Sequence, residues 1–139
     1  MPAVQKSIRI QENTLKEIER IARDSKKEFS VVANELLEEA VKMQRCPGIV
    51  FTEGTTGRRA RIAGSGMEVW EIIATYKSVQ KDFERIRKAY HWLTEQQLLA
   101  AVGYYKAYPE EIERLIKLNE EMTEEHIREI HPFLRQGAR

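Results

Sequence analysis

Residues Val4 to Ile10 alternate apolar and polar side chains. One face of an extended chain would carry Val4, Ile8 and Ile10, and the other would carry Gln5, Ser7 and Arg9. A period of two with β-branched residues is typical of a half-buried strand. The pattern therefore predicts a short strand with an apolar inner face and a polar outer face.

Helical spacing replaces this alternation from Gln11 onward. The inward positions of a first helix would be Leu15, Ile18, Ile21 and Ala22. Lys26-Lys27-Glu28 interrupts the pattern, and Ser30 has the residue type of an N-cap for a second helix. The inward positions of that second helix would be Ala33, Leu36, Leu37, Ala40 and Val41. The segment is thus predicted to be one strand followed by two helices.

A lone strand leaves two unpaired edges and has no partner strand within this segment. An antiparallel strand from a second copy of the chain would satisfy one edge and form a two-stranded ribbon over four helices. The helices of each copy would then close the core of the other. Dimerisation through the N-terminal strand is therefore expected to be part of folding.

From Gln5 to about Met43 the chain resembles the ribbon-helix-helix family, the Arc- and MetJ-like repressors. In that family a two-stranded ribbon enters the major groove of double-stranded DNA, and the outward side chains contact bases. The resemblance implies that Gln5, Ser7 and Arg9 read the operator. It also implies a phosphate contact at the start of the second helix. The residues involved there would be Ser30 and Val31, with Lys26 and Lys27 just before them. Lys6 departs from the family, which often has an apolar residue at that position.

Pro47-Gly48 marks a break between this segment and a second module. Ile49-Val50-Phe51 is strand-like, Thr52 to Gly57 is predicted as a turn, and Arg58 to Ile62 as a returning strand. Gly64-Ser65-Gly66 ends this hairpin. Helices are then expected from about Met67 to Lys77 and from Lys81 to Tyr90. A third helix follows through Leu98, Leu99, Val102 and Tyr105, and Thr94 with Gln97 forms a capping box at its start.

This second module is similar to the domain of unknown function numbered 433, a family of small helix-turn-helix-like domains often described as antitoxins. The similarity spans about Cys46 to Tyr108. It depends on Arg61-Ile62-Ala63-Gly64-Ser65-Gly66 and on the run from His91 to Ala101. The family commonly has Gly-Thr-Arg where this chain has Gly64-Ser65-Gly66. The role of that arginine is therefore missing or falls to Arg58, Arg59 or Arg61.

Two further basic or polar regions could contact a partner. The third helix would expose Glu95, Gln96 and Gln97 if it were a recognition helix, although a leading glutamate is repelled by phosphate. Arg58, Arg59 and Arg61 on the hairpin could contact phosphate or an acidic partner surface. The alternative for these arginines is an ordinary solvated strand edge, where charge discourages aggregation.

The C-terminal segment has the pattern of a strongly acidic amphipathic helix. Pro109 suits the first helical position, and acidic residues follow it in the first turn. A narrow apolar stripe would contain Ile112, Leu115, Ile116, Asn119 and Met122. Such a helix packs on its own module or on a second subunit, and its acidic face could mask a basic partner. His131-Pro132 would end it.

Composition and charge restrict the class of protein. Of the 139 residues, 42% are hydrophobic and 32% charged, so the chain can form a core. Residues 46–90 carry 8 basic and 5 acidic side chains, whereas residues 91–139 carry 6 and 9. No apolar run is long enough for a membrane span, and the N-terminus lacks the apolar region of a signal peptide. Cys46 is the sole cysteine and reads as a small buried hydrophobe. We expect a cytoplasmic protein.

Catalytic and metal-binding patterns are missing from the sequence. There is no phosphate loop, HExxH motif, nucleophile elbow or paired-carboxylate motif. His126 and His131 are five residues apart, which puts them on different helical faces. His91 lies at a turn before Trp92, where packing or capping explains it. We therefore expect neither an enzyme nor a cofactor or metal site.

Together these patterns predict a mainly α protein with a ribbon-helix-helix dimer head. A small β-hairpin with a helix-turn-helix-like module follows. The predicted boundaries are 1–45 for the head, 46–108 for the second module and 109–139 for a helical extension. The resemblances imply the antitoxin and autorepressor of a toxin-antitoxin operon, with operator DNA and a protein toxin as partners. The alternatives are a repressor in which both modules bind DNA, and a structural dimer.

Overall fold

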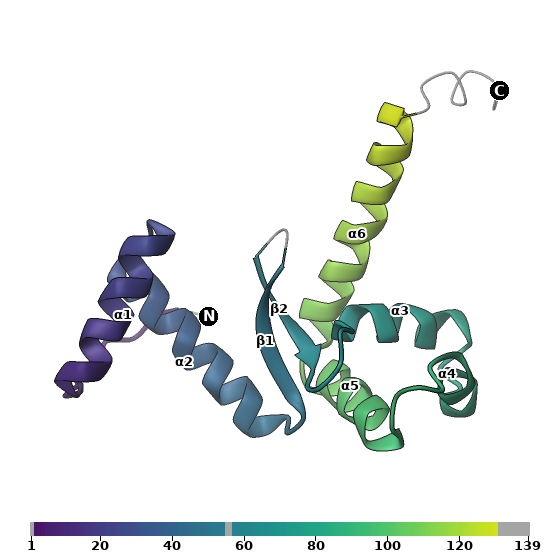
Figure 1. The fold of residues 1–139 in the computed structure, drawn as a ribbon, viewed down its shortest axis with the longest axis horizontal. Helices are drawn as coiled ribbons and strands as arrows, with labels where there is room; N and C mark the ends of the chain where they lie inside the picture. Colours follow the sequence, from purple (N-terminus) through teal and green to yellow (C-terminus); the bar gives the residue numbers. More distant parts are fainter. Residues whose placement is uncertain (1, 55–56, 131–139) are drawn as a thin grey trace. The chain divides into compact units, whose positions relative to one another are not determined.

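The computed structural model describes residues 2–54 and 57–130, and the chain divides into two compact units (Figure 1). The units are Met1–Gln44 and Arg45–Arg139. Over the described residues the chain is mainly helical, with a two-stranded antiparallel sheet. The predicted mainly α class and the predicted hairpin are therefore confirmed. His131 and Pro132 lie outside the described residues.

The first unit contains helices α1 (Glu12–Ser25) and α2 (Phe29–Arg45). Helix α1 is capped at its C-terminus by Lys26, which has a left-handed backbone with φ of 57°. The Lys26 and Lys27 N–H groups donate to the carbonyl oxygens of Arg23 and Ala22. This pair of bonds satisfies carbonyl groups that the end of the helix leaves without a partner. The predicted break at Lys26-Lys27-Glu28 is thus confirmed.

The predicted N-cap at Ser30 is wrong, because α2 already begins at Phe29. The N–H of Val32 donates to the Glu28 carbonyl oxygen at 3.2 Å, so the first helical bond reaches back beyond Ser30. Ser30 instead lies within the first turn, and its carbonyl oxygen accepts a hydrogen bond from the side-chain amide of Asn34 at 2.8 Å.

Residues 2–11 form neither helix nor strand in the single chain. A strand is defined by its pairing, and no partner strand exists within the described part of this chain. The predicted strand from Val4 to Ile10 is therefore not present here. A ribbon between two copies remains a prediction, because it requires a second chain.

Most large apolar side chains of the first unit are exposed. Among the described residues 2–44, the buried hydrophobic ones are Ala22 and Val32. Val4 is 87% exposed, Leu37 57% and Val41 62%. The other exposed large apolar side chains of this unit are those of Ile8, Ile10, Ile21, Val31, Leu36 and Met43. Of the positions predicted to point inward, Ala22 is buried and Leu15, Ile18 and Ala33 are half-buried, whereas the larger Ile21, Leu36, Leu37 and Val41 are left exposed by the described part of this unit.

The second unit opens with the hairpin of β1 (Ile49–Gly54) and β2 (Gly57–Ile62). The register pairs Ile49 with Ile62 and Gly54 with Gly57. Both strands are longer than predicted, because Thr52 to Gly54 and Gly57 pair within the ladder and do not belong to the turn. Gly57 has a φ of 119°, a conformation that glycine adopts readily. Thr55 and Thr56 lie outside the described residues.

Two helices pack on this hairpin, and a third helix and the start of a fourth pack on those two. They are α3 (Val69–Ser78), α4 (Phe83–Ala89), α5 (Glu95–Ala107) and α6 (Pro109–Ile130). The largest side chains buried in their common core are Tyr104, Ile62, Ile72, Ile73, Ile86, Leu98 and Ile112. The C-terminal half of α6 extends beyond the other elements of its unit (Figure 1), and residues 120–130 are all exposed.

Capping residues determine where these helices begin. The Thr94 hydroxyl accepts from the Gln97 N–H at 3.0 Å, and the Gln97 side chain accepts from the Thr94 N–H at 2.8 Å. This is the predicted capping box, and Pro109 is the first residue of α6 as predicted. Helices α3 and α4 begin two residues later than expected, because Glu68 and Asp82 cap them.

Leu99 was expected to point inward on α5 but is 51% exposed. Leu98 and Val102 occupy the buried face, and a neighbouring position on a helix is rotated by about 100° from it. No helix within residues 2–54 and 57–130 is long and apolar enough to cross a membrane. The same residues contain no group of three potential metal ligands.

Candidate nucleic-acid interface

The three predicted base-reading residues precede α1. Gln5, Ser7 and Arg9 are exposed. Within the part of the chain that the structure describes, no hydrogen bond or ion pair is formed by these side chains. Their donors and acceptors are therefore available to a ligand without breaking a contact of the chain.

The second predicted contact lies at the turn between the helices. Ser30 and Val31 are exposed in the first turn of α2, ahead of the first N–H that bonds within the helix. Their N–H groups are therefore among the donors that a helix start leaves unsatisfied. No acidic residue lies in that first turn, although Glu28 immediately precedes it. The positive end of the helix dipole is thus open to an anion.

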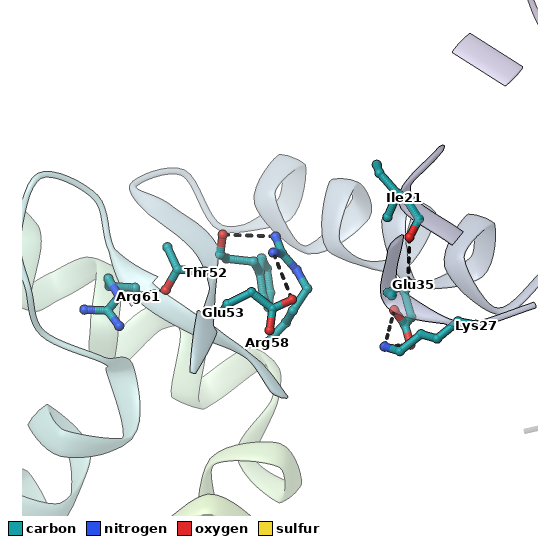
Figure 2. A network of polar contacts seen from close by, with 9 residues as sticks. Ile21, Lys27, Glu35, Thr52, Glu53, Arg58 and Arg61 are labelled. Atoms are coloured by element: carbon teal, nitrogen blue, oxygen red, sulfur yellow. Dashed lines mark hydrogen bonds and ion pairs between the residues drawn. The ribbon is translucent and has the colours of Figure 1, made fainter. Parts of the chain in front are cut away.

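The two lysines before α2 differ in their surroundings. Lys26 is exposed at the left-handed end of α1. The Lys27 ammonium donates to both carboxylate oxygens of Glu35, at 3.1 and 3.2 Å, as Figure 2 shows. Both side chains are more than two fifths exposed, and a pair of this kind contributes at most about 1 kcal/mol. Lys27 could therefore exchange Glu35 for a phosphate at little cost.

The three arginines of the hairpin contact the second unit's own groups. Arg58 donates to the Phe51 carbonyl oxygen at 3.1 Å and lies 3.9 Å from the Glu53 carboxylate (Figure 2). Arg61 donates to the Thr52 hydroxyl and to the Gly66 carbonyl oxygen, at 2.8 and 2.7 Å. These contacts brace the hairpin and the turn that follows it.

Arg59 is less exposed than Arg58. Its side chain is 11% exposed and lies 3.8 Å from Glu68 Oε1. Glu68 also caps α3, and its other oxygen accepts from the Trp70 indole N–H at 3.2 Å. Sequence reasoning missed Glu68, although the Glu68-x-x-Glu71 spacing is that of a capping box with a carboxylate at its first position.

Helix α5 has little free polarity at its start. Gln97 uses its carbonyl oxygen in the capping box, and its amide donates to the Ala63 carbonyl oxygen at 3.2 Å. The Gln97 side chain therefore stabilises the turn after β2, and its amide is not available to hydrogen-bond a DNA base. The remaining exposed residues of the first turn are Glu95 and Gln96, of which the glutamate repels phosphate.

Two tyrosine–glutamate hydrogen bonds join α6 to α5 within the second unit. The Tyr104 hydroxyl donates to Glu111 at 2.7 Å, and burial together with this bond raises the pKa of the Tyr104 phenol. The Tyr105 hydroxyl donates to Glu113 at 2.6 Å, which raises the pKa of Tyr105 to about 12. Lys77 also donates to Glu113, at 2.6 and 2.8 Å, and these bonds lower the pKa of the Glu113 carboxyl. The first turns of α6 are therefore held against α3 and α5.

Cys46 lies in the core of the second unit, as predicted for a small buried hydrophobe. Burial raises the pKa of its thiol, which keeps the sulfur in its less nucleophilic protonated form. It lines an open cavity of about 550 Å³ together with Leu99, Ala100, Gly103 and Tyr104.

His91 is exposed and contacts the ring of Trp92 edge to face, with centroids 5.2 Å apart. This agrees with the packing role expected for it. His126 lies on the exposed half of α6, and His131 lies outside the described residues.

Comparison with known proteins gives one family match. No curated protein and no solved structure matches the chain. The matching family model carries the description "Protein of unknown function (DUF433)" and covers β1, β2, α3, α4 and most of α5. Residues 49–105, which contain the hairpin, α3, α4 and most of α5, are therefore similar to the DUF433 family.

Proposed function

We propose that this protein is a sequence-specific DNA-binding dimer, the antitoxin and autorepressor of a toxin-antitoxin operon. The first unit would bind the operator, and the second would bind the toxin. The single observation that carries the DNA-binding half is the uncovered apolar face of the first unit.

That face is too large to be left in water. Nine large apolar side chains of residues 2–44 are exposed, whereas the buried hydrophobic residues described there are one alanine and one valine. An apolar surface of this kind on a small unit marks an interaction site. A second copy covers it most simply, because the same face is then buried twice and each copy supplies the missing core of the other.

Pairing of residues 4–10 between two copies would complete the head. These residues have unpaired backbone groups and alternating side chains, which an antiparallel partner strand would satisfy. Val4, Ile8 and Ile10 would then face the four helices. Gln5, Ser7 and Arg9 of both copies would form the outer face of the ribbon, whose width suits the major groove.

The chemistry of that outer face suits base readout. An arginine can donate two hydrogen bonds to guanine O6 and N7, and a glutamine can pair with adenine N6 and N7. The N–H groups of Ser30 and Val31, with Lys26 and Lys27 beside them, would bind a phosphate of the DNA backbone. The base-contacting and the phosphate-contacting residues would thus come from one unit of the chain.

The antitoxin half rests on the likeness of residues 49–105 to DUF433, together with the antitoxin role often ascribed to that family. The contacts of Gln97 and the negative charge of Glu95 disfavour base reading by α5. A protein-binding role for the second unit is therefore preferred over a second DNA-binding module.

Replacing Arg9 with alanine should weaken specific operator binding by about 1–3 kcal/mol, because a bidentate base contact is lost. Binding to unrelated DNA should change much less. The measurement is a mobility-shift titration of the full chain with promoter DNA of its own operon. Circular dichroism should be unchanged, since Arg9 forms no contact within the described chain.

Lys88→Ala is the matched control, because it removes one exposed positive charge from α4. It should bind the operator like the wild type. If Arg9→Ala binds normally and Lys88→Ala does not, the operator is bound by the second unit and the proposed reader is wrong.

A further inference from the structure

The C-terminal half of α6 carries an apolar stripe that no other described element of its own unit covers. Positions 112, 116, 127 and 130 fall on one side of a helix with 3.6 residues per turn. Ile112 and Ile116 are in the core, whereas Ile127 is 52% and Ile130 51% exposed. Met122, at the margin of this stripe, is 43% exposed. Past the end of the core, after Asn119 and Thr123, the same side of α6 therefore becomes apolar again at Ile127 and Ile130.

Acidic side chains border this stripe. Residues 117–130 contain five glutamates against Lys117 and Arg128. Arg128 donates to Glu124 at 2.6 Å, so one of the two cations is already neutralised. Among the described residues no ion pair is formed by the four remaining glutamates, which are Glu120, Glu121, Glu125 and Glu129. The exposed half of the helix thus has a net charge of −3.

This charge restricts what can cover the stripe. DNA and anionic lipid surfaces are repelled by it. Two copies of the helix would bring two segments of net charge −3 together, with few cations to compensate. A protein surface with an apolar groove bordered by lysine and arginine is complementary in both polarity and charge.

We propose that residues 117–130 of α6 dock into such a basic-rimmed apolar groove on a partner protein. The segment from Ile116 to Ile130 is about 21 Å long at 1.5 Å per residue, enough for Met122, Ile127 and Ile130 to act as anchors. The inference rests on the proposed function, since it assigns the toxin's contact to a surface outside residues 49–105.

The test uses the full chain and the protein encoded by the adjacent gene of the same operon. Ile127→Glu/Ile130→Glu should weaken binding of that protein at least about tenfold, because two apolar anchors are lost at once. Operator binding and circular dichroism should be unchanged, since both side chains are half exposed. The control is Leu99→Glu, which places a charge at an equally exposed leucine of α5 and should bind the partner normally.

The outcomes separate this inference from the proposed function. If the wild type and the double variant bind the partner equally well, the docking site is wrong and the antitoxin role is unaffected. Absence of any binding by the wild type overturns the antitoxin role, and the docking site with it. Light scattering could also show a smaller oligomer for the double variant while its partner binding is unchanged. In that case the stripe is covered by a second copy of the chain, and the inference is overturned.

Discussion

Replacing Ile8 with aspartate should abolish the dimer and, with it, operator binding. In the proposed ribbon Ile8 faces the shared core, where an unpaired carboxylate carries a penalty on the order of several kcal/mol. The mass measured by light scattering should fall toward the 16.3 kDa of one chain, and helix content in circular dichroism should decrease as the first unit unfolds.

Ser7→Asp is the matched control, because it introduces the same charge one residue earlier on the outer face. It should keep the dimer and lose DNA binding, since the carboxylate would face phosphate and base acceptors. Trp70 and Trp92, both in the second unit, should report unchanged fluorescence for both variants. If the Ile8→Asp variant still forms a folded dimer, the face that carries Ile8 is not a shared core.

Replacing Tyr104 with alanine should destabilise the second unit by about 3–5 kcal/mol, the range found for large buried aromatic side chains. Tyr104 is fully buried, contacts Phe51 and Tyr108, and donates to Glu111. Its loss removes apolar packing and leaves the Glu111 carboxylate without this donor. Urea unfolding followed by tryptophan fluorescence measures the effect, because both tryptophans lie in this unit.

Two variants calibrate this result. Tyr104→Phe keeps the ring and loses the hydroxyl, so it should cost about 1 kcal/mol. Leu99→Ala, at an exposed position of the same helix, should stay within about 0.5 kcal/mol of the wild type. Equal unfolding midpoints for Tyr104→Ala and Leu99→Ala would contradict the position of Tyr104 in the core.

Local signals predicted the second unit well where a side chain bonds to the backbone beside it. The Thr94–Gln97 capping box and Pro109 at the start of α6 depend on neighbours within a few residues, and both are found. The exposure of Leu99 depends on which face of α5 meets α3 and the hairpin. Periodicity alone does not distinguish two adjacent apolar positions, so the prediction failed there.

In the first unit, local signals predicted the helices but could not supply the partner of the N-terminal segment. Its helices and the break between them follow from local spacing, but the partner of Val4 to Ile10 does not lie in the chain. The start of α2 was misplaced at Ser30, because a serine with capping chemistry followed a phenylalanine that already has helical geometry. Of the candidate site, the DNA contacts of Gln5, Ser7 and Arg9 stay a prediction, whereas the internal contacts of Arg58, Arg59 and Arg61 required the fold.

Hydrogen exchange of the backbone amides from Val4 to Ile10 tests the central claim, an intermolecular ribbon that presents the DNA-reading face, most directly. In the single chain these amides belong to no helix or strand, so they would exchange as fast as in an unfolded peptide. The proposed ribbon predicts slow exchange at alternate residues at concentrations where the dimer forms, and loss of that protection in Ile8→Asp. Fast exchange at every one of these residues in a chain whose α1 and α2 amides are protected would contradict the ribbon, and with it the proposed DNA-binding head.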